Sequence, residues 1–183
     1  MDIRSIEGQI TPDEINRLQH LASLVPEHGL IVEIGAFRGR STAALASGSK
    51  DSVTILSIDP WCLQGKSQQG YETLETMNAY RRNIDPWQQK IIQVVAFPVE
   101  FARMFNAPID LLFVDCVKDY ERLFPIWRAY APHCRGWIAS HDCKPVYPDV
   151  VRIVDEYLKP NTTQHNHVDW LWSGRVKNDL HAR

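Results

Sequence analysis

The sequence lacks any apolar run of the roughly 20 residues that a membrane-spanning helix needs, and residues 1–9 lack the basic-then-apolar order of a signal peptide. It also lacks a strong charge of either sign, because 20 basic residues face 22 acidic ones. No broad basic face for nucleic acid is therefore expected. The four cysteines show no C-x-x-C spacing, so we expect free thiols in a reducing compartment. These absences favour a cytoplasmic protein that binds neither membrane nor nucleic acid.

Internal repeats and low-complexity segments are absent as well. With 183 residues, of which 44% are hydrophobic and 23% charged, the chain suits one domain with a sizeable core. We expect an N-terminal helix within residues 1–29, where Thr11-Pro-Asp-Glu14 has the form of a capping box, followed by an α/β core over residues 30–183.

A further absence concerns the glycines. The stretch Leu30–Thr42 predicts a buried strand that stops at Gly35, a glycine turn to Gly39, and a helix over 41–47 that Ser41 caps and Gly48 ends. Such a turn brings a ligand close to the backbone. The close glycine pair of the dinucleotide fingerprint G-x-G-x-x-G is missing, which disfavours a nicotinamide-dependent oxidoreductase.

Instead, the pattern reads E-x-G-x-x-x-G-x-S, with Glu33 at the end of the strand. This pattern resembles the first motif of class I S-adenosylmethionine-dependent methyltransferases. The resemblance implies that Glu33 lies near the cationic methionine end of the cofactor, and that the turn from Gly35 to Gly39 wraps the cofactor. The predicted cofactor-binding residues are Glu33, Gly35, Ala36, Phe37, Gly39, Ser41, Thr42, Asp59, Pro60, Trp61, Phe97 and Asp115.

The remaining pattern predicts alternating strands and helices. Strands are expected over 53–59, 91–96, 109–115 and 136–142, helices over 71–83, 120–131 and 148–158, a loop over 62–70, and a final strand or hairpin within 167–177. Pro125 must sit in the first turn of its helix or kink it. We therefore predict a doubly wound, mostly parallel, Rossmann-like sheet of seven strands with an antiparallel C-terminal strand or hairpin.

Acids close four of the predicted strands: Glu33, Asp59, Asp115 and Asp142. Carboxyl ends of parallel strands share one edge of a sheet, so these acids are expected to gather there. Asp59 is predicted to accept hydrogen bonds from ribose hydroxyls; the alternative is that it caps the turn at Pro60. Trp61 covers the adenosine or belongs to the core, and Phe97 could only stack on the adenine.

The segment Asp115-Cys-Val-Lys118-Asp resembles the D-x-x-K-D element of catechol-type O-methyltransferases. That resemblance implies that Asp115 binds Mg²⁺ and that Lys118 deprotonates the substrate hydroxyl, with Asp142 as a second metal ligand. Those relatives have Asp-Asn where this chain has Asp142-Cys143, so one oxygen ligand is missing. Two alternatives stay open: a metal-free site, and a Lys118 that is merely solvated. A zinc site with Cys116, His141 and Cys143 is a minor hypothesis, since neighbouring strand residues point to opposite faces.

Over its whole length the chain is similar to a small bacterial methyltransferase family active on sugars and secondary metabolites. The similarity rests on E-I-G-x-x-x-G-R-S-T, I-D-P-W, the segment 115–121 and the pair His141-Asp142. That family usually carries Asp-Gly-Asp-His-Ser-Tyr-Glu, so Lys118 replaces its histidine.

These observations predict an S-adenosylmethionine-dependent O-methyltransferase of a small hydroxylated molecule, with Lys118 and Asp115 as catalytic residues and Mg²⁺ as a second cofactor. The alternative is a binding or regulatory protein that kept the cofactor site and lost catalysis. The tail, with Trp170 and Trp172, is either core or the surface of a homodimer.

Overall fold

The computed structural model describes residues 2–64 and 73–177 of the chain. The strands are β1 (Leu30–Ile34), β2 (Thr54–Asp59), β3 (Ile91–Val95), β4 (Ile109–Val114), β5 (Cys134–Ser140), β6 (Thr162–Val168) and β7 (Leu171–Val176). The helices are α1 (Pro12–Ser23), α2 (Arg40–Gly48), α3 (Leu74–Ile84), α4 (Pro98–Phe101), α5 (Tyr120–Tyr130) and α6 (Pro148–Ile153), which continues as a π-helical turn (Val154–Leu158). Short 3-10 turns cover Ile3–Ser5, Trp61–Gln64, Asp85–Lys90, Ala102–Met104, Ala131–His133 and Lys159–Asn161. Most of the loop predicted over 62–70, and the predicted start of the helix at 71, lie outside the described residues.

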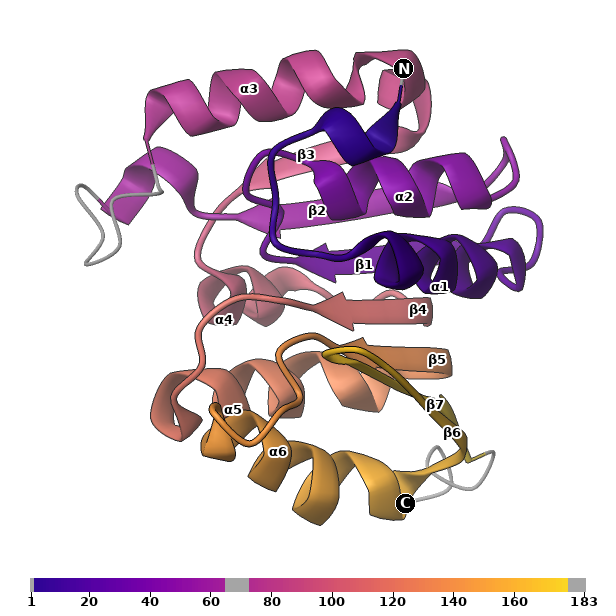
Figure 1. Ribbon diagram of the computed structural model, residues 1–183, viewed down its shortest axis with the longest axis vertical. Helices are drawn as coiled ribbons and strands as arrows, with labels where there is room; N and C mark the ends of the chain where they lie inside the picture. The colour runs from indigo at the N-terminus through magenta and orange to yellow at the C-terminus, as the bar shows by residue number, and fades with distance from the viewer. Residues whose placement is uncertain (1, 65–72, 178–183) are drawn as a thin grey trace.

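The described residues form one seven-stranded sheet in the order β3-β2-β1-β4-β5-β7-β6. Strands β1 to β5 pair in parallel, whereas β7 runs antiparallel to both β5 and β6. Figure 1 shows the sheet from β3 at the top to β6 and β7 at the bottom, with β1, β2 and β4 pointing left. The predicted doubly wound sheet with a C-terminal hairpin is confirmed. The strand order reverses between β1 and β4, and in such sheets ligands bind at this point, at the carboxyl ends of the strands.

Two apolar layers cover the faces of the sheet, because alternate residues of each strand point to opposite sides. Val32 and Ile34 of β1 face α5 and α6, in a core that includes Trp127. Ile31 of the same strand faces α1 and α2. A third cluster packs α3 beside the glycine turn through Trp61, Met77, Tyr80 and Ile84. Because β1, β2, β4 and β5 pair in parallel, their carboxyl ends lie at one edge of the sheet, which we call the carboxyl edge.

The predicted cap is present at the start of α1 and absent at the start of α2. Thr11 and Glu14 form the predicted capping box of α1. The prediction that Ser41 caps α2 is wrong: the helix begins at Arg40 after Gly39, and no side chain of the described residues caps it. Ser41 instead turns its hydroxyl inward, toward Glu33.

Several predicted boundaries shift in the structure. β4 ends at Val114 and β5 at Ser140, so Asp115 and Asp142 follow their strands instead of closing them. Pro125 lies within α5, beyond the first-turn position that it tolerates best. In the tail, Trp172 is buried in the core, whereas Trp170 is 38% exposed in the β6–β7 turn. None of the helices in the described residues is long and apolar enough to cross a membrane.

Candidate active site

The glycine turn after β1 packs against the backbone that follows β4. Gly35 and Gly39 both have φ of 88°, a left-handed conformation that favours glycine. A Cβ atom on Gly35 would lie 1.9 Å from the carbonyl oxygen of Asp115. Phe37, between the two glycines, also has a positive φ of 48°. The turn is therefore held in a strained conformation next to Asp115, as is common at functional sites.

Glu33 lies beneath this turn and is fully buried. Ser41 donates a hydrogen bond of 2.6 Å to its Oε1, while Thr42 and Ser57 donate to its Oε2 at 2.5 and 2.7 Å. Burial raises the pKa of Glu33 to about 7, although the three hydroxyl groups act in the opposite direction. Glu33 faces the interior and positions the start of α2 from below, through Ser41 and Thr42. Its predicted place near the methionine end of a cofactor stays a prediction.

Asp59 binds the other side of the turn. Its Oδ2 accepts hydrogen bonds from the amides of Ala36 and Phe37 at 2.8 and 3.1 Å, and its Oδ1 accepts one from the amide of Trp61 at 2.7 Å. The bond to Trp61 spans two residues and caps the turn at Pro60, which was the alternative left open by the sequence. A carboxylate has about four acceptor sites, so a ribose contact by Asp59 stays a prediction.

Trp61 is fully buried and packs on Tyr80 with ring centroids 4.8 Å apart. Its indole N–H donates to the carbonyl of Phe37 at 2.8 Å. Trp61 therefore belongs to the core, as the alternative interpretation held, and it stabilises the glycine turn from behind. Its predicted contact with the adenosine stays a prediction.

Two carboxylates and a lysine meet at the ends of β4 and β5. Lys118 Nζ lies 2.7 Å from Asp115 Oδ1 and also forms an ion pair with Asp142 Oδ2. Burial alone would lower the pKa of Lys118, but the two carboxylates raise it above its usual value. Burial would raise the pKa of Asp115, but the charges of Lys118 and His141 hold it below its usual range. The arrangement favours a charged ammonium at Lys118, and the predicted role of this residue as a base stays a prediction.

His141 completes this cluster from a fully buried position. Its Nδ1 lies 3.2 Å from Asp115 Oδ2, and its Nε2 lies 3.2 Å from Glu14 Oε2 in α1. Burial lowers the pKa of His141, but the surrounding carboxylates outweigh it and raise the pKa to about 12. The sequence placed His141 only in a minor zinc hypothesis. It joins the acids because the backbone leaves the strand at Ser140 and Asp142 adopts a φ of 57°.

The cluster also tests the predicted magnesium site. Asp115, His141 and Asp142 bring three possible ligand atoms within 4.8 Å of one another, but the Lys118 ammonium pairs with both carboxylates. The ammonium lies where an ion bridging these carboxylates would lie, and two cations repel each other strongly at such distances. The residues, arranged as they are, do not fit Mg²⁺. In the described part of the chain Cys116 and Cys143 are free thiols outside this group of ligand atoms, which also speaks against zinc.

The other predicted residues lie around the same edge. Pro60 follows β2 directly, and Phe97 follows β3 as a half-buried residue before α4. Residues that sequence reasoning missed include Ser57, which pairs with Glu33 across β1 and β2, and Glu14, which holds His141. Ser57 can be recognised only when the register of β1 and β2 is known. Glu14 can be recognised only when the packing of α1 is known.

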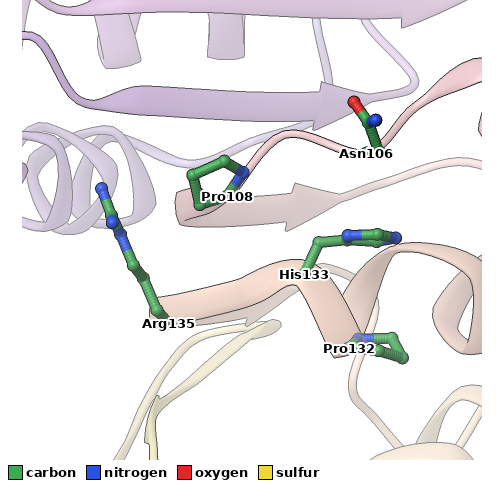
Figure 2. A pocket seen from close by; sticks show the side chains of 5 residues that line it. All are labelled: Asn106, Pro108, Pro132, His133 and Arg135. Atoms are coloured by element: carbon green, nitrogen blue, oxygen red, sulfur yellow. The ribbon is translucent and has the colours of Figure 1, made fainter. Parts of the chain in front are cut away.

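A hollow of about 290 Å³ lies elsewhere, between Asn106, Pro108, Pro132, His133 and Arg135. Figure 2 shows these side chains around it, on the segments that lead into β4 and β5. It is therefore at the amino ends of these strands, at the opposite edge of the sheet from Asp115 and Asp142. Arg135 also pairs there with Asp110.

A profile of methyltransferase domains matches residues 32–143, which is more than half of the chain. The chain belongs to this family of methyltransferase domains. No curated protein sequence matches it. The family, together with the sheet order, confirms the resemblance to class I S-adenosylmethionine-dependent methyltransferases. It does not address the D-x-x-K-D element, which stays a resemblance.

Solved structures share the fold of this methyltransferase domain at low identity. An O-methyltransferase from Bacillus cereus, in complex with S-adenosylhomocysteine, is 15% identical, with a TM-score of 0.70, and the match covers 95% of this chain and 86% of that chain. TomG, an O-methyltransferase from Streptomyces achromogenes in complex with S-adenosylmethionine and involved in tomaymycin synthesis, is 16% identical, with a TM-score of 0.62 and coverage of 92% and 82%. CalS11, a TDP-rhamnose 3′-O-methyltransferase of calicheamicin biosynthesis, is 16% identical, with a TM-score of 0.64 and coverage of 88% and 77%. At such identities these likenesses show the fold.

Gly35→Ala tests the close approach of the turn to β4 in this methyltransferase domain. The added Cβ would clash with the Asp115 carbonyl and force alanine into a left-handed conformation, so we expect a loss of at least about 2 kcal/mol in the free energy of unfolding. Urea denaturation measures it. Gly8→Ala is the control, because its Cβ would meet only the Arg40 side chain, at 3.0 Å. Equal losses in both variants would contradict the constraint.

Glu33→Gln tests the buried carboxylate through its pH dependence. Because the folded-state pKa of about 7 exceeds the ordinary value of 4.5, the folded state binds a proton that the unfolded chain has released between these values. The free energy of unfolding of the wild type should therefore fall, relative to that of Glu33→Gln, by about 3 kcal/mol as the pH rises from 4.5 to 8. Urea denaturation at several pH values measures this difference. Glu27→Gln, at an exposed position, is the control substitution. A wild-type to Glu33→Gln difference that stays constant with pH would refute the prediction.

Proposed function

We propose that the protein transfers a methyl group from S-adenosylmethionine to a hydroxyl of a small molecule. The observation that carries this proposal is the Lys118 ammonium, fixed between Asp115 and Asp142 beside the glycine turn and still 27% exposed at its side chain. A cation at the carboxyl edge is suited to stabilise a substrate oxygen as it loses its proton.

The surroundings of the turn support a place for the cofactor. α2 starts without a side-chain cap within the described residues, so the first N–H groups of the helix suit the carboxylate of the cofactor's methionine part. Asp115 lies across Gly35 and offers a negative charge to the cationic part. The adenosine then extends toward Asp59, Pro60 and Phe97, at the ends of β2 and β3. Glu33 and Trp61 act indirectly, by holding the turn.

The chemistry follows from charge. The acceptor oxygen attacks the sulfonium methyl in line, a C–O bond forms, and the electrons of the S–C bond remain on sulfur. Lys118 stabilises the negative charge on the oxygen, while the hydroxyl proton passes to water. Lys118 is then an electrostatic catalyst, and Asp115 is a positioning residue that holds the ammonium in place. Mg²⁺ has no part in this proposal, because its place is taken.

The class of methyl acceptor is inferred from the names of two structural neighbours and from the family resemblance. The names of CalS11 and TomG give O-methylation in a sugar nucleotide and in tomaymycin synthesis, respectively. Together with the resemblance to enzymes of sugars and secondary metabolites, they favour a small hydroxylated acceptor. We propose no nucleic-acid or membrane partner.

A second candidate is a cofactor-binding protein without catalysis. The observation that favours it is the same ion cluster, since both Asp115 and Lys118 are engaged with each other and neither is a free base. Binding and turnover experiments separate the two candidates.

Asp59→Ala tests the cofactor site. Loss of the carboxylate releases the amides of Ala36 and Phe37 and removes the ribose acceptor, so we expect at least about tenfold weaker binding of S-adenosylhomocysteine. Isothermal titration calorimetry measures this change. Asp51→Ala, at an exposed aspartate, is the control and should bind as the wild type does. No heat from the wild type with either S-adenosylmethionine or S-adenosylhomocysteine would overturn the proposal.

Lys118→Met tests the chemistry. It keeps the unbranched side chain except for its last atom and removes the charge, so we expect kcat to fall about 100-fold with a cofactor affinity within about threefold. The assay follows radiolabelled methyl transfer to a panel of hydroxylated sugars and phenols. Lys159→Met removes a surface lysine that pairs with Asp155 and should retain full activity. Cofactor binding without methylation of any compound by the wild type would favour the second candidate.

A further inference from the structure

The ion cluster contains the parts of a metal site with a lysine inside it. We propose that the Lys118 ammonium occupies the cation position of an otherwise complete divalent-metal site, so that the protein works without a metal and engages its acceptor through a single oxygen. The role in the reaction rests on the proposed function, whereas the occupancy of the site does not.

Three donor side chains surround the Lys118 ammonium. Asp115, Asp142 and His141 converge to within 4.8 Å, and the His141 and Asp142 side chains are 0% and 2% exposed. His141 Nδ1 faces both carboxylates, 3.2 Å from Asp115 Oδ2 and 3.6 Å from Asp142 Oδ1. Glu14 binds the other ring nitrogen of His141, an arrangement that orients histidines bound to metals. Two carboxylates and an imidazole with an outer carboxylate would suit Mn²⁺ or Co²⁺ if the position between them were open.

The Lys118 ammonium closes the position between the two carboxylates. Lys118 reaches it from three residues beyond Asp115 and pairs with one oxygen of each carboxylate. A second cation a few ångströms away would be repelled by the ammonium. Only one cation, the ammonium or a metal ion, can occupy this space. Because Lys118 is part of the chain, its ammonium is always present there and excludes the metal ion.

The Lys118 ammonium also limits how an acceptor can bind. An ammonium has three N–H donors, and Asp115 and Asp142 take two of them, which leaves one for a substrate oxygen. A magnesium ion, by contrast, offers several open positions and can chelate two neighbouring oxygens. The lysine therefore selects an acceptor by one hydroxyl and gives no advantage to a vicinal diol.

The decisive test is metal binding by Lys118→Ala, measured with Mn²⁺ alone by electron paramagnetic resonance and by calorimetry. We expect no binding to the wild type up to about 1 mM Mn²⁺, and at least about 30-fold tighter binding to Lys118→Ala. Binding should disappear in Lys118→Ala combined with Asp142→Asn, and should be absent in Lys118→Arg, which keeps a cation. Lys159→Ala frees a surface carboxylate, Asp155, and should bind no Mn²⁺.

Thermal melting and S-adenosylhomocysteine binding establish that each variant is folded. Equal Mn²⁺ binding by the wild type and Lys118→Ala would overturn the inference, as would a folded Lys118→Ala and a folded Lys118→Ser that both bind no Mn²⁺. If Mn²⁺ binds as expected but the wild type methylates nothing, the proposed function fails and the occupancy of the site stands. For an active enzyme, a preference above about tenfold for vicinal diols over matched single hydroxyls would contradict acceptor selection by one oxygen.

Discussion

The buried carboxylate of Glu33 joins three elements, and the arrangement of the site depends on it. Its oxygens accept hydrogen bonds from Ser41 and Thr42 of α2 and from Ser57 of β2. A buried carboxylate costs free energy unless it is hydrogen-bonded, so α2 and β2 are held at fixed positions relative to β1. Above this carboxylate, Gly35 lies against the backbone of Asp115 with no room for a side chain. The two contacts bring the glycine turn and the end of β4 together at the reversal of the strand order.

Charge at the carboxyl edge is balanced by the protein itself. Four acids end or follow neighbouring strands, yet each has partners: hydroxyls for Glu33, backbone amides for Asp59, and Lys118 for Asp115 and Asp142. His141 lies between Asp115 and Glu14. The acids at the carboxyl edge are therefore balanced without a bound metal ion, and the Lys118 ammonium remains partly exposed. In a metal site the ion would carry this positive charge, whereas here Lys118 carries it.

The sequence predicted the elements and their order well, since each depends on local patterns. The strand before Gly35, the capping box at Thr11 and the C-terminal hairpin are examples, and the gathering of acids at one edge followed from the parallel sheet. What it could not predict depends on register and on side-chain direction. Ser57 meets Glu33 only because the two residues are paired across β1 and β2. The hydroxyl of Ser41 can accept a hydrogen bond from an amide at the helix start or donate one to Glu33, and it donates to the buried carboxylate.

The side-chain directions of Trp61 and Lys118 could not be predicted either, because a residue that follows a strand can point into the interior or toward solvent. We propose that a sulfonium nucleoside binds beside a lysine that serves as the cation of the site. A crystal structure of the protein soaked with S-adenosylhomocysteine and Mn²⁺ can show both. We expect the nucleoside across the carboxyl edge, with Lys118 Nζ between Asp115 and Asp142 and no anomalous peak there. A manganese peak between these carboxylates, with Lys118 turned away, or a nucleoside bound elsewhere, would contradict the proposal.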